Sequence, residues 1–176
     1  MPLREITVDS AAALAMEFVR GSCSSEDIAA AAKAAGVGML LFQPKKRAAI
    51  WEELFCASAG IAAHSISESR SSRVAIKVAQ TVFEVEVFRQ ARKLLGPENE
   101  AANPRFHQKI RAYKAALLVG QDAIGLSTLF LENLRSTLCS LEGNTGLQLV
   151  PILASMQMAM RDGMNQHRIV LDDDDE

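Results

Sequence analysis

The strongest constraint on the fold is a heptad pattern that runs between two helix-terminating signals, Asn103-Pro104 and Gly143-Asn144. Asn-Pro is typical of a helix N-cap followed by proline at the first helical position, and Gly-Asn is typical of a helix end. Apolar residues recur at every seventh position between them, at Ile110, Leu117, Ile124, Leu131 and Leu138. The companion heptad positions hold Phe106, Tyr113, Gly120, Ser127, Leu134 and Leu141. We call these two sets the heptad seam, and it predicts one long helix or a helical hairpin over 104–142.

The segment 73–95 has an ambiguous pattern. Residues 81–88 are β-branched and partly alternating, as in a strand. At helical spacing, the same segment carries one stripe with Val74, Val78, Val82, Val85 and Arg89 and a second with Ile76, Phe83, Val87 and Leu94. The pattern ends at Gly96-Pro97, a typical helix terminator. We therefore predict a helix, and the two stripes indicate the central helix of a bundle.

Helix caps predict further helices on either side of these two segments. Thr7 or Asp9 begins a helix that runs to about Arg20 and is closed by Gly21 in the left-handed conformation. The capping box Ser24-Ser25-Glu26-Asp27 begins a helix over about 25–35 that stops at Gly36.

Proline marks two more helix starts. Pro44 begins a helix that ends near Gly60 and is followed by a serine-rich loop or frayed helix start over 65–72. Pro151 begins a last helix that runs to Met164. The fold class is thus an all-α helical bundle of about six or seven helices, with one domain over 1–171 and an acidic C-terminal tail over 172–176.

Composition and localisation signals are those of a globular cytoplasmic protein. The chain has 176 residues, of which 49% are hydrophobic and 23% charged. No apolar run reaches the roughly 18 residues of a membrane span, and acidic residues near the N-terminus do not fit a signal peptide. Cys23, Cys56 and Cys139 are odd in number and widely spaced, which favours reduced, buried thiols over disulfides or zinc ligands.

No catalytic, metal-binding or cofactor-binding motif is present. His64, His107 and His167 are scattered, without acidic residues at ligand spacing, and Gly36-Val37-Gly38 is a fragment of a dinucleotide-binding pattern that lacks its third glycine. We therefore expect no metal, no cofactor and no catalysis, and a small helical enzyme assembled from distant residues is the third alternative.

Charge is distributed unevenly along the chain. The segment 70–114 has a net charge of +6, whereas the five residues Asp172 to Glu176 are all acidic. Two clusters of cations lie at predicted helix starts: Lys45, Lys46 and Arg47 after Pro44, and Arg105, Lys109 and Lys114 after Pro104. Positive charge there opposes the helix dipole, at a cost of a few tenths to about 1 kcal/mol for each residue. The candidate anion-binding residues are Lys45, Lys46, Arg47, Arg70, Arg73, Lys77, Arg89, Arg92, Lys93, Arg105, Lys109, Arg111 and Lys114. The alternative is that they are only the solvated faces of helices.

These patterns lead to a hypothesis of function. We expect a non-catalytic, self-associating helical protein that binds the backbone of RNA or DNA, as a nucleocapsid-like or coat-like protein does, with the acidic tail competing for the same basic patch. Aromatic residues are scarce, so only Phe88, Phe106 and Tyr113 are near enough to stack on bases. We expect the protein to form a homo-oligomer. The residues assigned to the interface between copies are Ile110, Leu117, Ile124, Leu131 and Leu138.

The runner-up function is a protein-binding adaptor or effector domain. It would use the heptad face or the methionines of the last helix, and the basic patch would then meet an acidic protein partner. Methionines at helical spacing are more often core residues, so Met156, Met158, Met160 and Met164 are expected to be buried.

Overall fold

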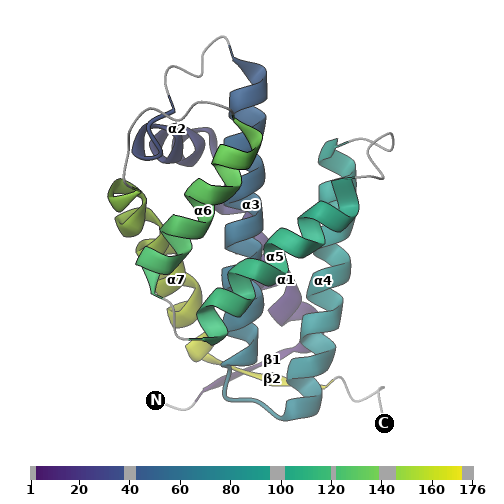
Figure 1. Cartoon of the computed structure of the whole chain (residues 1–176). Coiled ribbons are helices and arrows are strands. Elements are labelled where there is room, and N and C mark those ends of the chain that lie inside the picture. The colour runs from purple at the N-terminus through teal and green to yellow at the C-terminus, as the bar shows by residue number, and fades with distance from the viewer. Residues whose placement is uncertain (1–2, 38–42, 96–101, 120–121, 139–145, 172–176) are drawn as a thin grey trace.

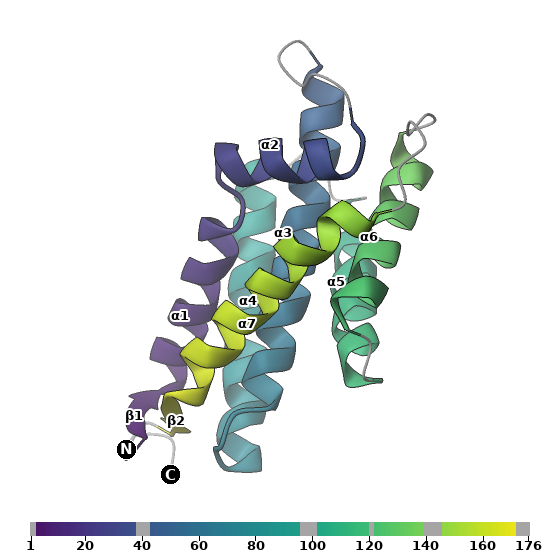
Figure 2. The same cartoon turned by 90° about the vertical axis from the view of Figure 1, so that its left-hand side faces the viewer.

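The computed structural model describes residues 3–37, 43–95, 102–119, 122–138 and 146–171. Within them, seven α-helices form a bundle, and two short strands lie at one end of it (Figures 1 and 2). The elements are β1 (Arg4–Thr7), α1 (Val8–Gly21), α2 (Ser25–Ala34), α3 (Pro44–Ser67), α4 (Arg73–Leu95), α5 (Ala102–Leu118), α6 (Ala123–Thr137), a 3-10 turn (Leu147–Leu149), α7 (Val150–Asn165) and β2 (His167–Val170). The predicted all-α bundle is confirmed, and every helix in the described part of the chain is too short or too polar to cross a bilayer.

The predicted helix caps are largely present. The Thr7 hydroxyl accepts a hydrogen bond from Ser10 N at 3.2 Å, and the Ser24 hydroxyl accepts one from Asp27 N at 3.1 Å. Gly36 adopts φ of +70°, the left-handed conformation expected of a helix terminator. The prediction for Gly21 is wrong, because α1 includes Gly21 and ends on Ser22, a C-cap in the right-handed helical region.

The central helix of the bundle is α3, not α4 as the sequence indicated. Figures 1 and 2 show α3 running through the middle of the molecule, and 15 of its 24 residues are buried. Its second half consists largely of Ala, Ser and Gly on every face, so neighbouring helices approach it from several sides. The predicted end at Gly60 is also wrong. Gly60 lies within α3, where a Cβ would be 2.5 Å from Tyr113 Cβ and 3.1 Å from Ile110 O on α5.

Helix α4 spans residues 81–88 without interruption, so the helix prediction for the ambiguous segment is confirmed. Its fully buried stripe is made of Ala75, Ala79, Phe83, Val87 and Ala91 at intervals of four residues, and Val78, Val82 and Phe88 pack half-buried against the same core. Val74 and Val85, which belonged to a predicted stripe, are 60% and 63% exposed. Alanines supply most of the true stripe because they let α1 and α3 pack closely against α4.

The heptad segment forms the hairpin alternative, α5 followed by α6, rather than one continuous helix. Asp122 caps α6 by accepting hydrogen bonds from Ile124 N and Gly125 N. Gly120, Leu141 and the predicted stop at Gly143-Asn144 lie outside the described residues.

Two strands that the sequence did not predict bring distant parts of the chain together. β1 and β2 pair in parallel, with Arg4 opposite His167 and Thr7 opposite Val170. Each strand has four residues, too few for a period-two pattern to be recognised. Figure 1 shows the pair at the end of the bundle where α4 begins.

Candidate functional site

Ten basic residues between positions 70 and 114 are candidates for anion binding, and the structure divides them into two groups. Arg89, Arg105 and Lys109 form ion pairs with acidic residues of the same chain. The other seven form no ion pair within the described residues and are half-buried or exposed: Arg70, Arg73, Lys77, Arg92, Lys93, Arg111 and Lys114. The two groups therefore differ in whether their charge is paired within the described residues.

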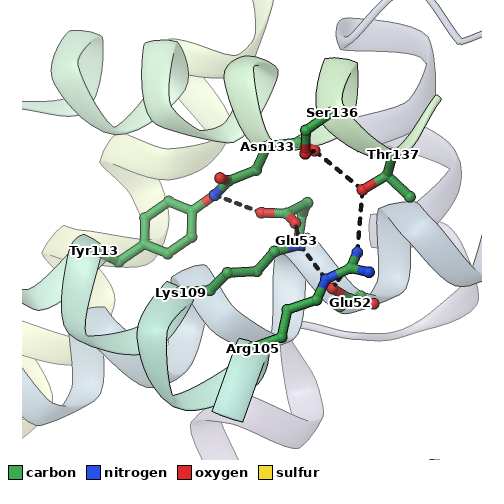
Figure 3. A network of polar contacts seen from close by, with 8 residues as sticks. All are labelled: Glu52, Glu53, Arg105, Lys109, Tyr113, Asn133, Ser136 and Thr137. Carbon is green, nitrogen blue, oxygen red and sulfur yellow. Dashed lines mark hydrogen bonds and ion pairs between the residues drawn. The ribbon is translucent and has the colours of Figure 1, made fainter. Parts of the chain in front are cut away.

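Lys109 lies in a polar network between α3, α5 and α6 (Figure 3). Its ammonium group is 2.6 Å from Glu52 Oε1 and also forms an ion pair with Glu53. Lys109 is only 8% exposed and Glu53 only 1%. The Tyr113 hydroxyl donates a hydrogen bond of 3.0 Å to the second oxygen of the Glu53 carboxylate. Buried charges are tolerated when they are paired and hydrogen-bonded in this way.

Opposing effects act on the Glu53 carboxyl. Burial raises the pKa of Glu53, whereas the charge of Lys109 and the hydrogen bonds from Lys109 and Tyr113 lower it. Asn133 adds the smallest lowering effect on this pKa. Its buried Nδ2 atom has no hydrogen-bond partner of normal geometry, so we regard that contribution as weak. The carboxylate is therefore held in place mainly by Lys109 and Tyr113.

Arg105 lies at the exposed edge of the same network. Its guanidinium group is 2.9 Å from Glu52 Oε1 and donates a hydrogen bond of 3.1 Å to Thr137 Oγ1 on α6. The formal charges of Glu52, Glu53, Arg105 and Lys109 cancel. The network therefore links three helices and leaves no excess charge for a ligand.

Three of the predicted anion-site residues are engaged in ion pairs within the chain. Lys109 was assigned to the anion-binding surface because it lies near a helix start, but it is buried and already paired with two carboxylates. Arg105 is half-exposed yet engaged with Glu52, and Arg89 is paired with Glu86. Their charges are thus balanced within the protein.

We call the seven cations without an ion pair in the described residues the basic face. They are Arg70, Arg73, Lys77, Arg92, Lys93, Arg111 and Lys114. Arg73 and Lys77 lie one turn apart near the start of α4, Arg92 lies near its end, and Arg111 lies on α5; all four are exposed. The acidic residue Glu84 is exposed on α4 and has no ion pair within the described residues, whereas Glu86 pairs with Arg20 and Arg89. The unpaired charge in the described part of this region is therefore strongly positive.

One aromatic pair lies at the junction of α4 and α5. The rings of Phe88 and His107 stack with centroids 3.3 Å apart, and both side chains are half-buried. Burial and the nearby Arg111 lower the pKa of His107, while Glu84 raises it. Phe106 and Tyr113, expected near the patch, are 1% and 0% exposed and belong to the core, so they offer no surface for stacking on bases.

The cluster Lys45, Lys46 and Arg47 occupies the first turn of α3, as predicted. Lys45 and Arg47 are exposed, and Arg47 donates a hydrogen bond of 3.1 Å to the Ser25 hydroxyl. The side chain of Gln43, the N-cap residue, forms no capping hydrogen bond with this helix. The start of α3 and the start of α4 lie at opposite ends of the bundle (Figure 1), so this cluster is separate from Arg70 and Arg73.

The heptad seam is mostly part of the intrachain core. Ile110, Leu117 and Leu131 are 8% exposed or less, and Leu138 is half-buried. Ile124 is 53% exposed. Packing against α3 and within the hairpin therefore covers Ile110, Leu117 and Leu131, and leaves Ile124 as the assigned residue that is widely exposed; self-association through this seam stays a prediction.

A shallow groove of about 580 Å³ lies between α5 and α6. Small and apolar residues line it, among them Ala112, Ala115, Gly125 and Leu129. Leu118, Val119 and Ile124 are all more than half exposed near the turn of this hairpin. This groove is the surface that the protein-binding alternative would use.

The methionines of α7 are divided between core and surface. Met160 and Met164 are buried, whereas Met158 is 56% exposed. Met156 lines a second groove of about 570 Å³ together with Phe18 and Ile152.

The side chains of Glu53, Lys109 and Tyr113 are of types that perform acid–base chemistry, but here they bind one another, and the two grooves are lined by other residues. In the described ranges, no group of three His, Cys, Asp or Glu side chains is placed to hold a metal ion. Cys23 and Cys56 are free thiols; burial raises the pKa of Cys23 to about 12 and that of Cys56 well above its usual value. Cys139 lies outside the described residues.

Comparison with known proteins adds no further constraint on function, because no family model, curated protein or solved structure matches this chain.

Proposed function

We propose that this protein is a non-catalytic binding protein that contacts the phosphate backbone of RNA or DNA through the basic face of α4 and α5. The observation that carries the proposal is the charge left over after intrachain pairing. Seven cations between 70 and 114 have no ion pair, against the single unpaired carboxylate of Glu84 in the described part of that region. A merely solvated helix face normally intersperses both signs of charge.

The arrangement of these cations fits an extended anion better than a small one. Arg73 and Arg92 lie 19 residues apart along α4, which corresponds to about 28 Å at the rise of an α-helix. A nucleic-acid strand presents one phosphate about every 3.4 Å of duplex axis, so one strand can meet several of these side chains. Six of the seven cations are exposed and Lys114 is half-buried, and among the described residues Phe106 and Tyr113 are too buried to stack on bases. Binding is therefore expected to depend little on sequence.

The proposal differs from the sequence-based hypothesis in its account of self-association. Most of the seam that was expected to join copies is buried within the chain, and Ile124 is its widely exposed residue among those assigned to self-association. Binding of the nucleic-acid backbone does not require assembly, and the proposal rests on the basic face alone.

Replacing Arg92 and Arg111 with glutamine should weaken binding and reduce its dependence on salt. Each phosphate contact releases counterions from the nucleic acid, so the loss of two contacts reduces that release. The slope of log Kd against log salt concentration should therefore become shallower by roughly 1.4 to 1.8. The measurement is fluorescence anisotropy with labelled single-stranded RNA and duplex DNA of about 20 nucleotides at several salt concentrations. Both residues lie outside the paired network, so the free energy of unfolding should change by less than about 0.5 kcal/mol.

A matched control is the pair Lys33→Gln and Arg135→Gln, which removes the same charge from exposed positions on α2 and α6. This control should leave the salt slope nearly unchanged. If both double variants lower the slope equally, the binding is a nonspecific effect of net charge and the basic face is not the site. If the parent protein binds neither RNA nor DNA at about 50 mM salt, the proposal fails and the groove between α5 and α6 favours the protein-binding adaptor.

A further inference from the structure

We infer that the start of α4 is a docking surface for the acidic segment 172–176 of the same chain, and that this segment competes there with the phosphate backbone. The docking surface, which we call the basic pole, consists of Arg70, Arg73 and Lys77. The competition rests on the proposed function, whereas the docking itself does not.

The fold places the beginning of the acidic segment next to the basic pole. The backbone N–H of Ile169 in β2 donates a hydrogen bond of 2.8 Å to the hydroxyl of Ser71, in the loop just before α4. β2 also packs against α4, and Ile169 is only 2% exposed. Leu171, the last residue described before the acidic segment, is half-buried. The chain therefore enters the acidic segment beside the first turn of α4.

The charges of the two surfaces are complementary. Residues Asp172 to Glu176 carry five negative charges. All three cations of the basic pole are exposed and form no ion pair within the described residues. Glu68 is an exposed acidic residue of the adjoining loop, so the local excess remains positive. Opposite charges held this close by the chain attract at a high effective concentration.

The length of the acidic segment limits which cations it can reach. Five extended residues span at most about 17 Å. Lys77 lies about 6 Å along the helix axis from Arg73 and is within this reach, whereas Lys93 lies about 30 Å from Arg73. The cluster Lys45–Arg47 is at the opposite end of the bundle. Docking within this reach therefore includes the basic pole and excludes Arg92, Lys93 and the Lys45–Arg47 cluster.

Zero-length crosslinking of the full chain tests the docking without any nucleic acid. A carbodiimide condenses a lysine amine with a carboxylate, and Lys77 is the only lysine of the basic pole. At low protein concentration and low salt, mass spectrometry should find the peptide containing Lys77 joined to the peptide that begins at Ile169. The Lys77→Arg variant keeps the positive charge but removes this product. Crosslinks from the acidic segment to Lys93 or Lys45 in place of Lys77, or no intrachain crosslink, would overturn the inference.

Neutralising the acidic segment tests the competition. The variant carrying Asp172→Asn, Asp173→Asn, Asp174→Asn, Asp175→Asn and Glu176→Gln keeps the chain length and should bind RNA or DNA about 5-fold more tightly at about 50 mM salt. The gain should shrink as the salt is raised from about 50 to about 200 mM, because the distance over which charges interact falls from roughly 14 Å to roughly 7 Å. The same change combined with Arg73→Gln and Lys77→Gln should give little gain, because the contested cations are then absent.

The two experiments separate failure of the inference from failure of the proposed function. Crosslinking to Lys77 without nucleic-acid binding supports the docking and contradicts the proposed function. Nucleic-acid binding that is unchanged in the neutralised variant, without the crosslink, supports the function and overturns the docking. A crosslink together with unchanged binding shows that the basic pole is not where the strand lies, which overturns the competition.

Discussion

Replacing Lys109 with methionine should lower the free energy of unfolding by about 3–5 kcal/mol, because it leaves the Glu53 carboxylate buried without its ion-pair partner. Glu53 is 1% exposed and would keep only the hydrogen bond from Tyr113 and the weak contribution of Asn133. Methionine preserves most of the volume of the lysine side chain, so the loss reports charge rather than a cavity. Urea unfolding followed by circular dichroism measures the change.

The loss should also depend on pH. Burial already raises the pKa of Glu53, and removing Lys109 takes away the largest effect that lowers it. A group whose pKa is higher in the folded state than in the unfolded state favours folding below the unfolded pKa, and this contribution is lost as the pH rises through the folded pKa. The Lys109→Met variant should therefore be less destabilised at about pH 5 than at about pH 8.

Two controls identify the ion pair as the cause. The double variant Glu53→Gln, Lys109→Met removes both charges and should recover much of the lost stability. Lys93→Met changes an exposed, unpaired lysine and should shift the free energy of unfolding by less than about 0.5 kcal/mol. An equal loss at both pH values, or no recovery in the double variant, would show that Lys109 does not compensate a buried carboxylate.

The polar network shows where sequence reasoning stopped. Lys109 is three residues after Phe106 and four before Tyr113, so it lies on the core-facing side of its own helix. A lysine on an apolar face predicts a buried acidic partner, and this signal was present in the sequence. The partner itself was not predictable, because Glu53 is 56 residues earlier in the chain and nothing local connects the two. The location of Lys109 near the start of a helix instead predicted an anion-binding role for it.

The helices themselves were predictable wherever caps or long periods marked them. Ser24, Pro44 and Gly36 act locally, and the structure uses each as expected. Which helix is the most buried was not predictable from such local signals. A helix rich in alanine and serine such as α3 shows no amphipathic stripe, so its central place in the bundle emerges only from what packs around it.

The exposed cations of the basic face were predictable as a group from the local excess of charge. Which of them are free was not, since Arg105, Arg89 and Lys109 find acidic partners on other turns or other helices. Burial of the heptad seam likewise depends on α3, which the periodicity of 104–142 does not reveal. A seam of this kind is satisfied equally by a second copy or by another helix of the same chain.

Replacing Gly60 with alanine should destabilise the protein by about 1–3 kcal/mol, although alanine is the better helix former. The added methyl group would lie 2.5 Å from Tyr113 Cβ and 3.1 Å from both Ile110 O and Lys114 N. Two of these atoms are backbone, so α5 as a whole must move away from α3. This movement would also disturb the Tyr113 hydroxyl that binds Glu53.

The same substitution at Gly163 is the matched control for Gly60. Gly163 lies in α7, and a Cβ there would meet nothing within 4 Å. Gly163→Ala should therefore stabilise the protein by about 0.5–1 kcal/mol, the ordinary gain from replacing glycine within a helix. The same substitution should thus lower the free energy of unfolding at Gly60 and raise it at Gly163, as measured by urea unfolding. If Gly60→Ala stabilises the protein as Gly163→Ala does, α3 and α5 do not approach each other as closely as the structure shows, and the packing that holds Tyr113 and Lys109 against Glu53 is wrong.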